Sequence, residues 1–132
     1  MTFLRTLAPH AHWFLRLALA SVFAYHGITK FPNLEGLSGM MGMPVPMIAV
    51  LATVETIAAA MILVGGISKD WMTRLAGLIF AIVMLGAIFM VHLQHGWNSI
   101  GNMGMEFQVT LLAIGLYFTV RGNDGVESAA AE

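Results

Sequence analysis

His26 and Lys30 are the residues of this chain that most clearly combine reactive types with a helical spacing. They close an apolar stretch that begins near Trp13, and residues four apart lie on one helix face, about 40° apart around the axis. An imidazole and an ammonium group can both donate hydrogen bonds. Ionisable side chains within a membrane usually face a bundle interior or a polar cavity, because exposing them to lipid is costly. The pair therefore marks a candidate site.

Three further ionisable residues, Glu55, His92 and Glu106, lie in later apolar stretches. If the chain crosses a membrane four times, these three join His26 and Lys30 between the bilayer middle and the outer surface. Glu55 would be the deepest, and chance placement would scatter such groups over both halves. We therefore predict a ligand-binding polar cavity formed by these five residues, with Glu55 paired to His26 or Lys30. No catalytic residue is assigned.

Each of these residues also has a simpler interpretation. Lys30 can extend its ammonium group to the outer headgroups, and Glu106 can favour the positive end of a helix dipole. Glu55 is too deep to reach the surface, so its alternative is a purely structural salt bridge or hydrogen bond. His92 and His95 can be ordinary interface residues. The sequence leaves these alternatives open.

The composition indicates an integral membrane protein. The 132 residues are 58% hydrophobic and 10% charged, whereas soluble domains carry roughly 25% charged residues. The net charge of −1 gives no sign of a nucleic-acid partner. The chain has no cysteine, which excludes disulfides, thiolate metal sites and redox thiols. Its length suits a single domain covering 1–132.

Four apolar segments predict an all-α, four-helix membrane bundle, with spans at about 13–31, 47–65, 71–93 and 105–120. The first span reaches roughly 28 Å, close to the thickness of the hydrocarbon layer. Pro32 ends it, and Pro44 and Pro46 open the second span, because proline suits the start of a helix. The first outer loop, 32–46, has apolar residues at helical spacing interrupted by glycines. That pattern is compatible with a short interfacial helix.

Basic residues give the orientation. Positively charged residues accumulate on the cytoplasmic side of membrane proteins. In the four-span arrangement all of them except Lys30 fall on one side: Arg5, Arg16, Lys69, Arg74 and Arg121. We therefore predict cytoplasmic termini and outward-facing loops at 32–46 and 94–104, with Arg16 and Arg74 acting as topology anchors.

Helical faces predict which residues point inward. Small residues let membrane helices approach closely, and Ala52 and Ala59 flank Glu55 on one face. In the third span, Gly77 and Ala81 share a face with Arg74 and His92. In the fourth, Glu106, Thr110, Ala113 and Tyr117 share a face, which we also expect to point inward.

Metal and haem chemistry have weak support in the sequence. Met40, Met41, Met43 and Met47 cluster in the first loop, and thioethers suit Cu(I), but methionine is also a common filler of apolar surface. A haem held by His26 and His92 would need an apolar slot that neighbouring charges would crowd. No metal site is predicted. Nucleotide-binding, zinc-protease and serine-hydrolase motifs are absent from the sequence.

Taken together, the motifs resemble those of the DoxX family, small four-helix membrane proteins related to the DoxD-type subunit of thiosulfate:quinone oxidoreductase. The matching features are Arg16-Leu17-Ala18, Phe23, His26-Gly27 and Lys30, then Gly42-Met43-Pro44, Glu55, Arg74-Leu75, His92 and Glu106-Phe107. The resemblance covers nearly the whole chain. It implies a bacterial inner-membrane location and quinone-linked or redox-partnered work.

Two functions follow from these observations. In the first, the protein is an inner-membrane subunit that interacts with a quinone cofactor or with a redox partner enzyme through the polar cluster. His26 and Lys30 would donate hydrogen bonds, Glu55 or Glu106 would pass protons, and a partner protein would supply electrons. In the second, it is a non-catalytic anchor or accessory subunit of a larger redox or stress-response complex. Lipid contacts and a partner subunit or homo-oligomer fit either function.

Overall fold

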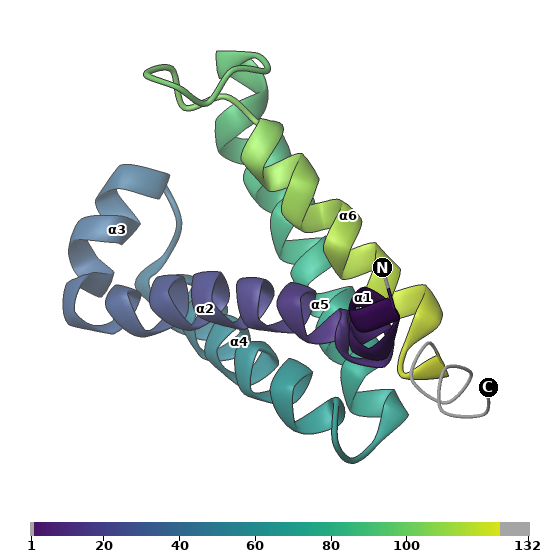
Figure 1. Ribbon diagram of the computed structural model, residues 1–132. Coiled ribbons are helices and arrows are strands. Elements are labelled where there is room, and N and C mark those ends of the chain that lie inside the picture. The colour runs from purple at the N-terminus through teal and green to yellow at the C-terminus, as the bar shows by residue number, and fades with distance from the viewer. Residues whose placement is uncertain (1, 125–132) are drawn as a thin grey trace.

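The computed structural model describes residues 2–124, and over that range its regular elements are all helices, joined by turns and loops (Figure 1). This confirms the predicted all-helical class. The elements, in chain order, are α1 (Thr2–Leu7), the 3₁₀ turn η1 (Ala8–His10), α2 (His12–Lys30), η2 (Phe31–Asn33), α3 (Leu34–Met41), α4 (Val45–Gly65), α5 (Asp70–Ala87), the π-helical turn η3 (Ile88–His92), η4 (Leu93–His95) and α6 (Glu106–Arg121).

The first loop contains the helix that the sequence left open, α3. Gly42 ends α3 in the left-handed conformation, with φ of 65°, which glycine adopts without a steric penalty. Pro44 then precedes α4, and Pro46 lies in its first turn, where the N–H that proline lacks would have no helical partner. These residues turn the chain back along α2.

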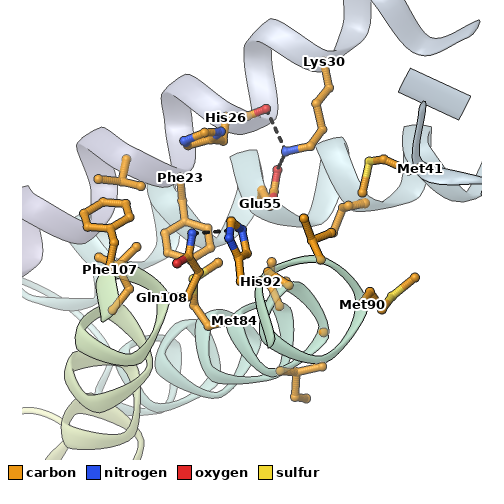
Figure 2. A pocket seen from close by; sticks show the side chains of 18 of the residues that line it. Phe23, His26, Lys30, Met41, Glu55, Met84, Met90, His92, Phe107 and Gln108 are labelled. Carbon is orange, nitrogen blue, oxygen red and sulfur yellow. Dashed lines mark hydrogen bonds and ion pairs between the residues drawn. The ribbon is translucent and has the colours of Figure 1, made fainter. Parts of the chain in front are cut away.

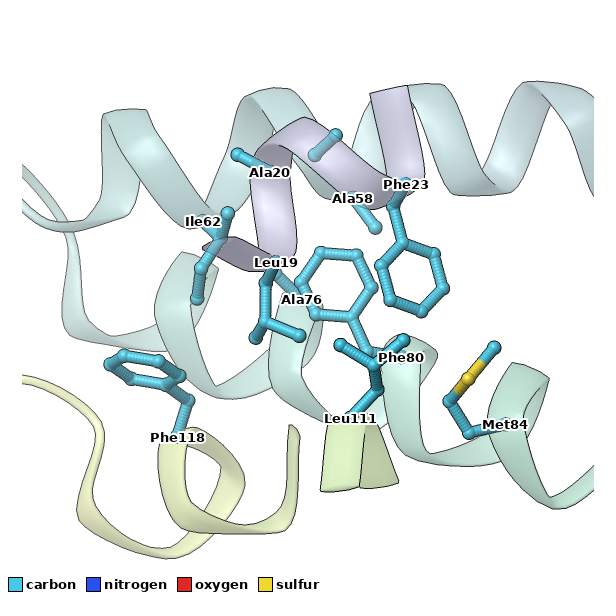
Figure 3. Close-up of a cluster of buried hydrophobic side chains, with 11 residues drawn as sticks. Leu19, Ala20, Phe23, Ala58, Ile62, Ala76, Phe80, Met84, Leu111 and Phe118 are labelled. Carbon is cyan, nitrogen blue, oxygen red and sulfur yellow. The ribbon is translucent and has the colours of Figure 1, made fainter. Parts of the chain in front are cut away.

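The long helices form two antiparallel pairs, α2 with α4 and α5 with α6, joined by contacts between α4 and α5. Figure 1 shows the pairs meeting near the chain termini and diverging toward α3 and the loop before α6. The core lies where they meet, and it includes Leu19, Phe23, Ile62, Phe80 and Phe118 (Figure 3). The divergence leaves open space between the pairs at the other end.

Among the described residues, two helices are long and apolar enough to cross a membrane. They are Val45–Gly65, with mean hydropathy 2.3, and the continuous helical segment Asp70–His95, with mean hydropathy 2.5. Many of their large apolar side chains are exposed, including Val50 and Phe89. Exposed apolar surface on such helices is suited to lipid.

The close pairing of α5 and α6 depends on glycines. A Cβ built on Gly77 would lie 2.6 Å from the carbonyl oxygen of Gly115, which is backbone and cannot move aside. Glycine is therefore required for this contact. Gly77 and Ala81 are both buried, as the sequence predicted for this face.

The inward face predicted for α6 is wrong. Thr110, Ala113 and Tyr117 are exposed, and the buried residues of α6 are Leu111, Gly115 and Phe118. The physical reason is the contact with α5: turning Gly115 toward Gly77 sets the rotation of α6 about its axis. The sequence pattern of α6 is apolar on most sides, so it did not reveal this choice.

Arg16, which the sequence predicted as a topology anchor, is completely buried, with 0% exposure. Its guanidinium donates to the Ile62 carbonyl (2.7 Å), the Thr73 hydroxyl (2.9 Å) and the Asn123 side-chain oxygen (2.7 Å). These partners come from α4, α5 and the residues after α6. Arg16 therefore ties both helix pairs together at the end where they meet, since a buried charge is stable only when it is hydrogen-bonded.

A fourth hydrogen bond of Arg16 runs from Nε to His12 Nδ1, at 2.9 Å. His12 precedes the first predicted span. Burial lowers the pKa of His12, and the Arg16 guanidinium lowers it further. The imidazole is thus kept neutral, which leaves Nδ1 free to accept the hydrogen bond. Arg74, predicted as an anchor in the same way, is partly exposed and pairs with Asp70 and Asp124.

Candidate functional site: a cavity between the helix pairs

A cavity of about 360 Å³ lies between the two helix pairs (Figure 2). Arg16 is not among the residues that line it. The cavity walls are mostly apolar, and α2, α3, α4, α5, η3 and α6 all contribute to them. The polar residues that line it are His26, Lys30, Glu55, His92 and Gln108. Four of the five residues predicted from the sequence are therefore brought to one cavity. An apolar hollow with a few placed polar groups is the usual form of a small-molecule site.

Lys30 and Glu55 form an ion pair on the α2–α4 wall, as the sequence proposed. Lys30 Nζ lies 2.5 Å from Glu55 Oε2 and 3.0 Å from the backbone carbonyl of His26. Glu55 has 4% exposure, whereas the Lys30 side chain retains 13% at the end of α2. Glu55 faces α2 between Ala52 and Ala59, which are also buried. The buried carboxylate is thus neutralised by a lysine that reaches in from the cavity mouth.

His26 lines the cavity, but its side chain is not the partner of Glu55. His26 is exposed, and its ring makes an edge contact with the Tyr25 ring at a centroid distance of 5.7 Å. The Lys30–Glu55 pair uses the backbone carbonyl of His26, because Lys30 is four residues later and its chain folds back over that turn. The imidazole therefore lines the rim of the cavity, and Lys30 is the residue paired with Glu55.

His92 reaches the cavity from the opposite wall, at the end of the π-helical turn Ile88–His92. Wider π turns are rare and often occur at functional sites. His92 Nδ1 lies 2.6 Å from the backbone carbonyl oxygen of Met103, and Nε2 lies 3.0 Å from Gln108 Nε2. Met103 itself has a φ of 53°, unusual for a residue with a side chain. The loop before α6 thus holds the imidazole in place.

Gln108 is a site residue that the sequence analysis missed. Its side-chain Oε1 is buried and has no hydrogen-bond partner among the described residues. Buried polar atoms are nearly always paired, so one without a partner in a cavity wall suggests a place for a ligand atom. A glutamine in an otherwise apolar span was the available signal, because it carries no charge and was not counted with the ionisable groups.

Glu106 lies outside the cavity lining. Its carboxylate oxygen Oε1 accepts a hydrogen bond from the Ser99 backbone N–H at 2.8 Å, so it ties the loop 96–105 to the first turn of α6. Its backbone N–H donates to the Trp97 carbonyl at 3.1 Å. Glu106 therefore supports the loop that carries Met103 and, through it, His92.

A second hollow adjoins the cavity and is lined only by apolar side chains. Its residues are Met43, Met47, Val50, Leu51, Val54 and Met90, of which Met43, Leu51 and Met90 also line the cavity. Val50 and Met47 are exposed on the outer surface of α4. The hollow thus continues the cavity sideways, across α4, toward the surface where lipid would lie.

The described residues contain no group of three His, Cys, Asp or Glu side chains placed to hold a metal ion. For haem, His26 and His92 both line the cavity, but both ring nitrogens of His92 are already engaged by Met103 and Gln108. An axial haem ligand needs a free ring nitrogen. The residues therefore do not fit a haem held by His92.

Comparison with known proteins gives the family. The sequence model of the DoxX family matches residues 11–93, and the chain belongs to this family. The chain is also 32% identical over 108 residues to a protein of Bacillus subtilis (strain 168) named "Putative oxidoreductase CatD", covering 80% of this chain and 75% of that protein. None of the solved structures matches the chain.

Proposed function

We propose that this protein is a redox-linked membrane subunit that binds a quinone in the cavity between its helix pairs. The observation that carries the proposal is the pairing of a largely apolar cavity with polar groups on opposite walls: Lys30 on one side and Gln108, held by His92, on the other. A quinone ring has oxygens on opposite edges of an apolar plane. The relative named as an oxidoreductase supports a redox role.

The adjoining hollow offers a place for the apolar tail of a membrane quinone. Membrane quinones carry a long apolar chain, which has to leave a buried ring site toward lipid. The hollow along α4 is apolar throughout and shares Met43, Leu51 and Met90 with the cavity. Unbranched methionine side chains adapt to irregular apolar shapes, which suits a flexible tail. The ring would lie in the cavity and the tail along α4.

The chemistry available to the chain itself is binding and proton handling. Interconversion of a quinone and a hydroquinone moves electrons together with protons. Lys30 and Glu55 can hold or move protons. Electrons would come from or pass to a partner enzyme, so the proposal includes a partner subunit.

We also propose four membrane spans in a bacterial inner membrane, with both termini cytoplasmic. In support, the N-terminal part of α2, the end of α4, the start of α5 and Asn123 just after α6 meet around Arg16. The helices thus alternate in direction. Lys69, Arg74 and Arg121 lie at the same end, and a positive side of this kind is typically cytoplasmic. The cavity would then open in the outer half of the bilayer.

Filling the cavity tests the proposal. Gly86 lines it, and a Cβ built there would meet nothing within 4 Å, so Gly86→Leu adds bulk without clashing with the core. Leu85→Phe adds bulk at an exposed position next to it. We expect the purified parent and Leu85→Phe to bind a tailed quinone, and Gly86→Leu to bind it at least tenfold more weakly. Absence of binding by the parent would refute the proposal and favour the non-catalytic anchor.

A further inference from the structure

We infer that the cavity selects ligands that present a hydroxyl group to Gln108, and thus binds the reduced hydroquinone more tightly than the oxidised quinone. This inference rests on the proposed function. It follows from a chain of hydrogen bonds that runs from Met103 through His92 to Gln108. The Met103 carbonyl oxygen, at one end of this chain, determines where the protons lie.

The first step is the tautomer of His92. Nδ1 lies 2.6 Å from the Met103 carbonyl oxygen, and a carbonyl oxygen can only accept. Nδ1 must therefore carry a proton. In a neutral imidazole the other nitrogen, Nε2, is then an acceptor.

The second step is the orientation of the Gln108 amide. Nε2 of His92 needs a donor, and the group 3.0 Å away is the Gln108 Nε2 amide nitrogen, which supplies one. With the amide nitrogen facing His92, the amide oxygen faces away from it. That oxygen, Oε1, is buried and has no partner among the described residues. The Met103 carbonyl therefore fixes the His92 tautomer, and the tautomer fixes the orientation of the Gln108 amide. As a result, the group of Gln108 that remains without a partner is the acceptor Oε1.

A ligand that cannot donate a hydrogen bond to Gln108 Oε1 binds less well. A buried acceptor left without a hydrogen-bond partner is unfavourable. A hydroquinone hydroxyl facing Oε1 donates a hydrogen bond and supplies that partner. A quinone carbonyl in the same place has no proton to give, so two acceptors would face each other. Sites built around a hydrogen bond to a ligand discriminate strongly against analogues that lack the matching group.

The opposite wall does not discriminate between the two forms. The Lys30 ammonium has three N–H donors, and two of them point to Glu55 and to the His26 carbonyl. The third can donate to an oxygen of either ring form, since carbonyl and hydroxyl oxygens both accept. The preference for the reduced ligand therefore depends on Gln108.

The experiment compares a tailed hydroquinone with the corresponding quinone, under anaerobic conditions, on the purified full chain in lipid nanodiscs. We expect the parent to bind the hydroquinone roughly tenfold more tightly, and Gln108→Met to bind both forms equally. Gln94→Met is the matched control, because Gln94 is exposed and outside the cavity. It should keep the parent's preference.

A second measurement needs neither ligand nor the Gln108 variant. In protein labelled with ¹⁵N at its five histidines, the His92 signals, identified by their loss in His92→Gln, should show a protonated Nδ1 and an unprotonated Nε2. A proton on Nε2 would overturn the inference even if Gln108→Met failed to fold. Equal binding of both ligands by the parent would overturn it while leaving the proposed function standing. Binding of neither would overturn both.

Discussion

Removing Lys30 should destabilise this protein more than neutralising Glu55. The two residues form the ion pair on the cavity wall, but they differ in how easily their charged groups could reach water if the partner were removed. Glu55 lies in the middle of α4 with 4% exposure and a short side chain, so its carboxylate cannot reach water. Lys30 ends α2, and its longer side chain is already 13% exposed.

The magnitudes follow from those positions. Lys30→Met leaves a buried carboxylate without a counter-charge, which typically costs about 3–5 kcal/mol. Glu55→Gln keeps the shape and an acceptor oxygen, and the Lys30 ammonium can move outward. Its cost should not exceed about 1.5–3 kcal/mol, the contribution of a hydrogen bond to a charged group. The double variant leaves no charge behind, so it should be closer to the parent than Lys30→Met is.

The assay is the free energy of unfolding, measured by titration from native detergent micelles into a denaturing detergent. Lys69→Met and Glu35→Gln make the same chemical changes at exposed positions and should change the free energy little. If Glu55→Gln proved more damaging than Lys30→Met, the assumption that Lys30 can leave the pair would be wrong. If neither variant differed from the parent, the ion pair would have no part in stability.

Three further outcomes are expected. Gly77→Ala should destabilise by about 1–3 kcal/mol because its Cβ meets the backbone of α6, whereas Gly86→Ala in the same helix should be neutral or slightly stabilising; equal effects would contradict the helix contact. Arg16→Met should lower the free energy of unfolding by at least about 3 kcal/mol in the same assay; a small effect would show that the hydrogen bonds of Arg16 between the helix pairs are dispensable. Cysteine at Ser99, but not at Ser68, should react with an impermeant thiol reagent on intact cells; the reverse result would invert the proposed orientation.

The hydrogen bonds of Arg16 and the cavity lie at opposite ends of the same two helix pairs. Hydrogen bonds from one guanidinium hold α2, α4, α5 and Asn123, just after α6, together at one end. At the other end Lys30 and Glu55 hold only α2 to α4, and the His92–Gln108 contact holds only η3 to α6. No hydrogen bond in the described residues connects the two walls across the cavity. This is why the pairs can diverge there and leave room for a ligand.

The helical class and much of the site could be read from the sequence, because both depend on local patterns. Long apolar stretches bounded by proline and turn residues are sufficient to predict helices. A charged residue in such a stretch needs a buried partner, so Glu55 could be paired in advance with His26 or Lys30, and the structure selects Lys30. The small-residue faces around Glu55 and Gly77 followed from the same helical periodicity.

What the sequence could not decide is how the helices rotate and how far apart they lie. The inward face of α6 was predicted wrongly, because the contact between Gly77 and Gly115 sets it, and no local pattern records that contact. The sequence predicted Arg16 as a topology anchor and gave no sign of its three hydrogen-bond partners from distant segments, Ile62, Thr73 and Asn123. Gln108 became a candidate only when the π turn at His92 and the Met103 carbonyl had oriented its amide. These features depend on contacts between residues far apart in the chain, so only the tertiary structure reveals them.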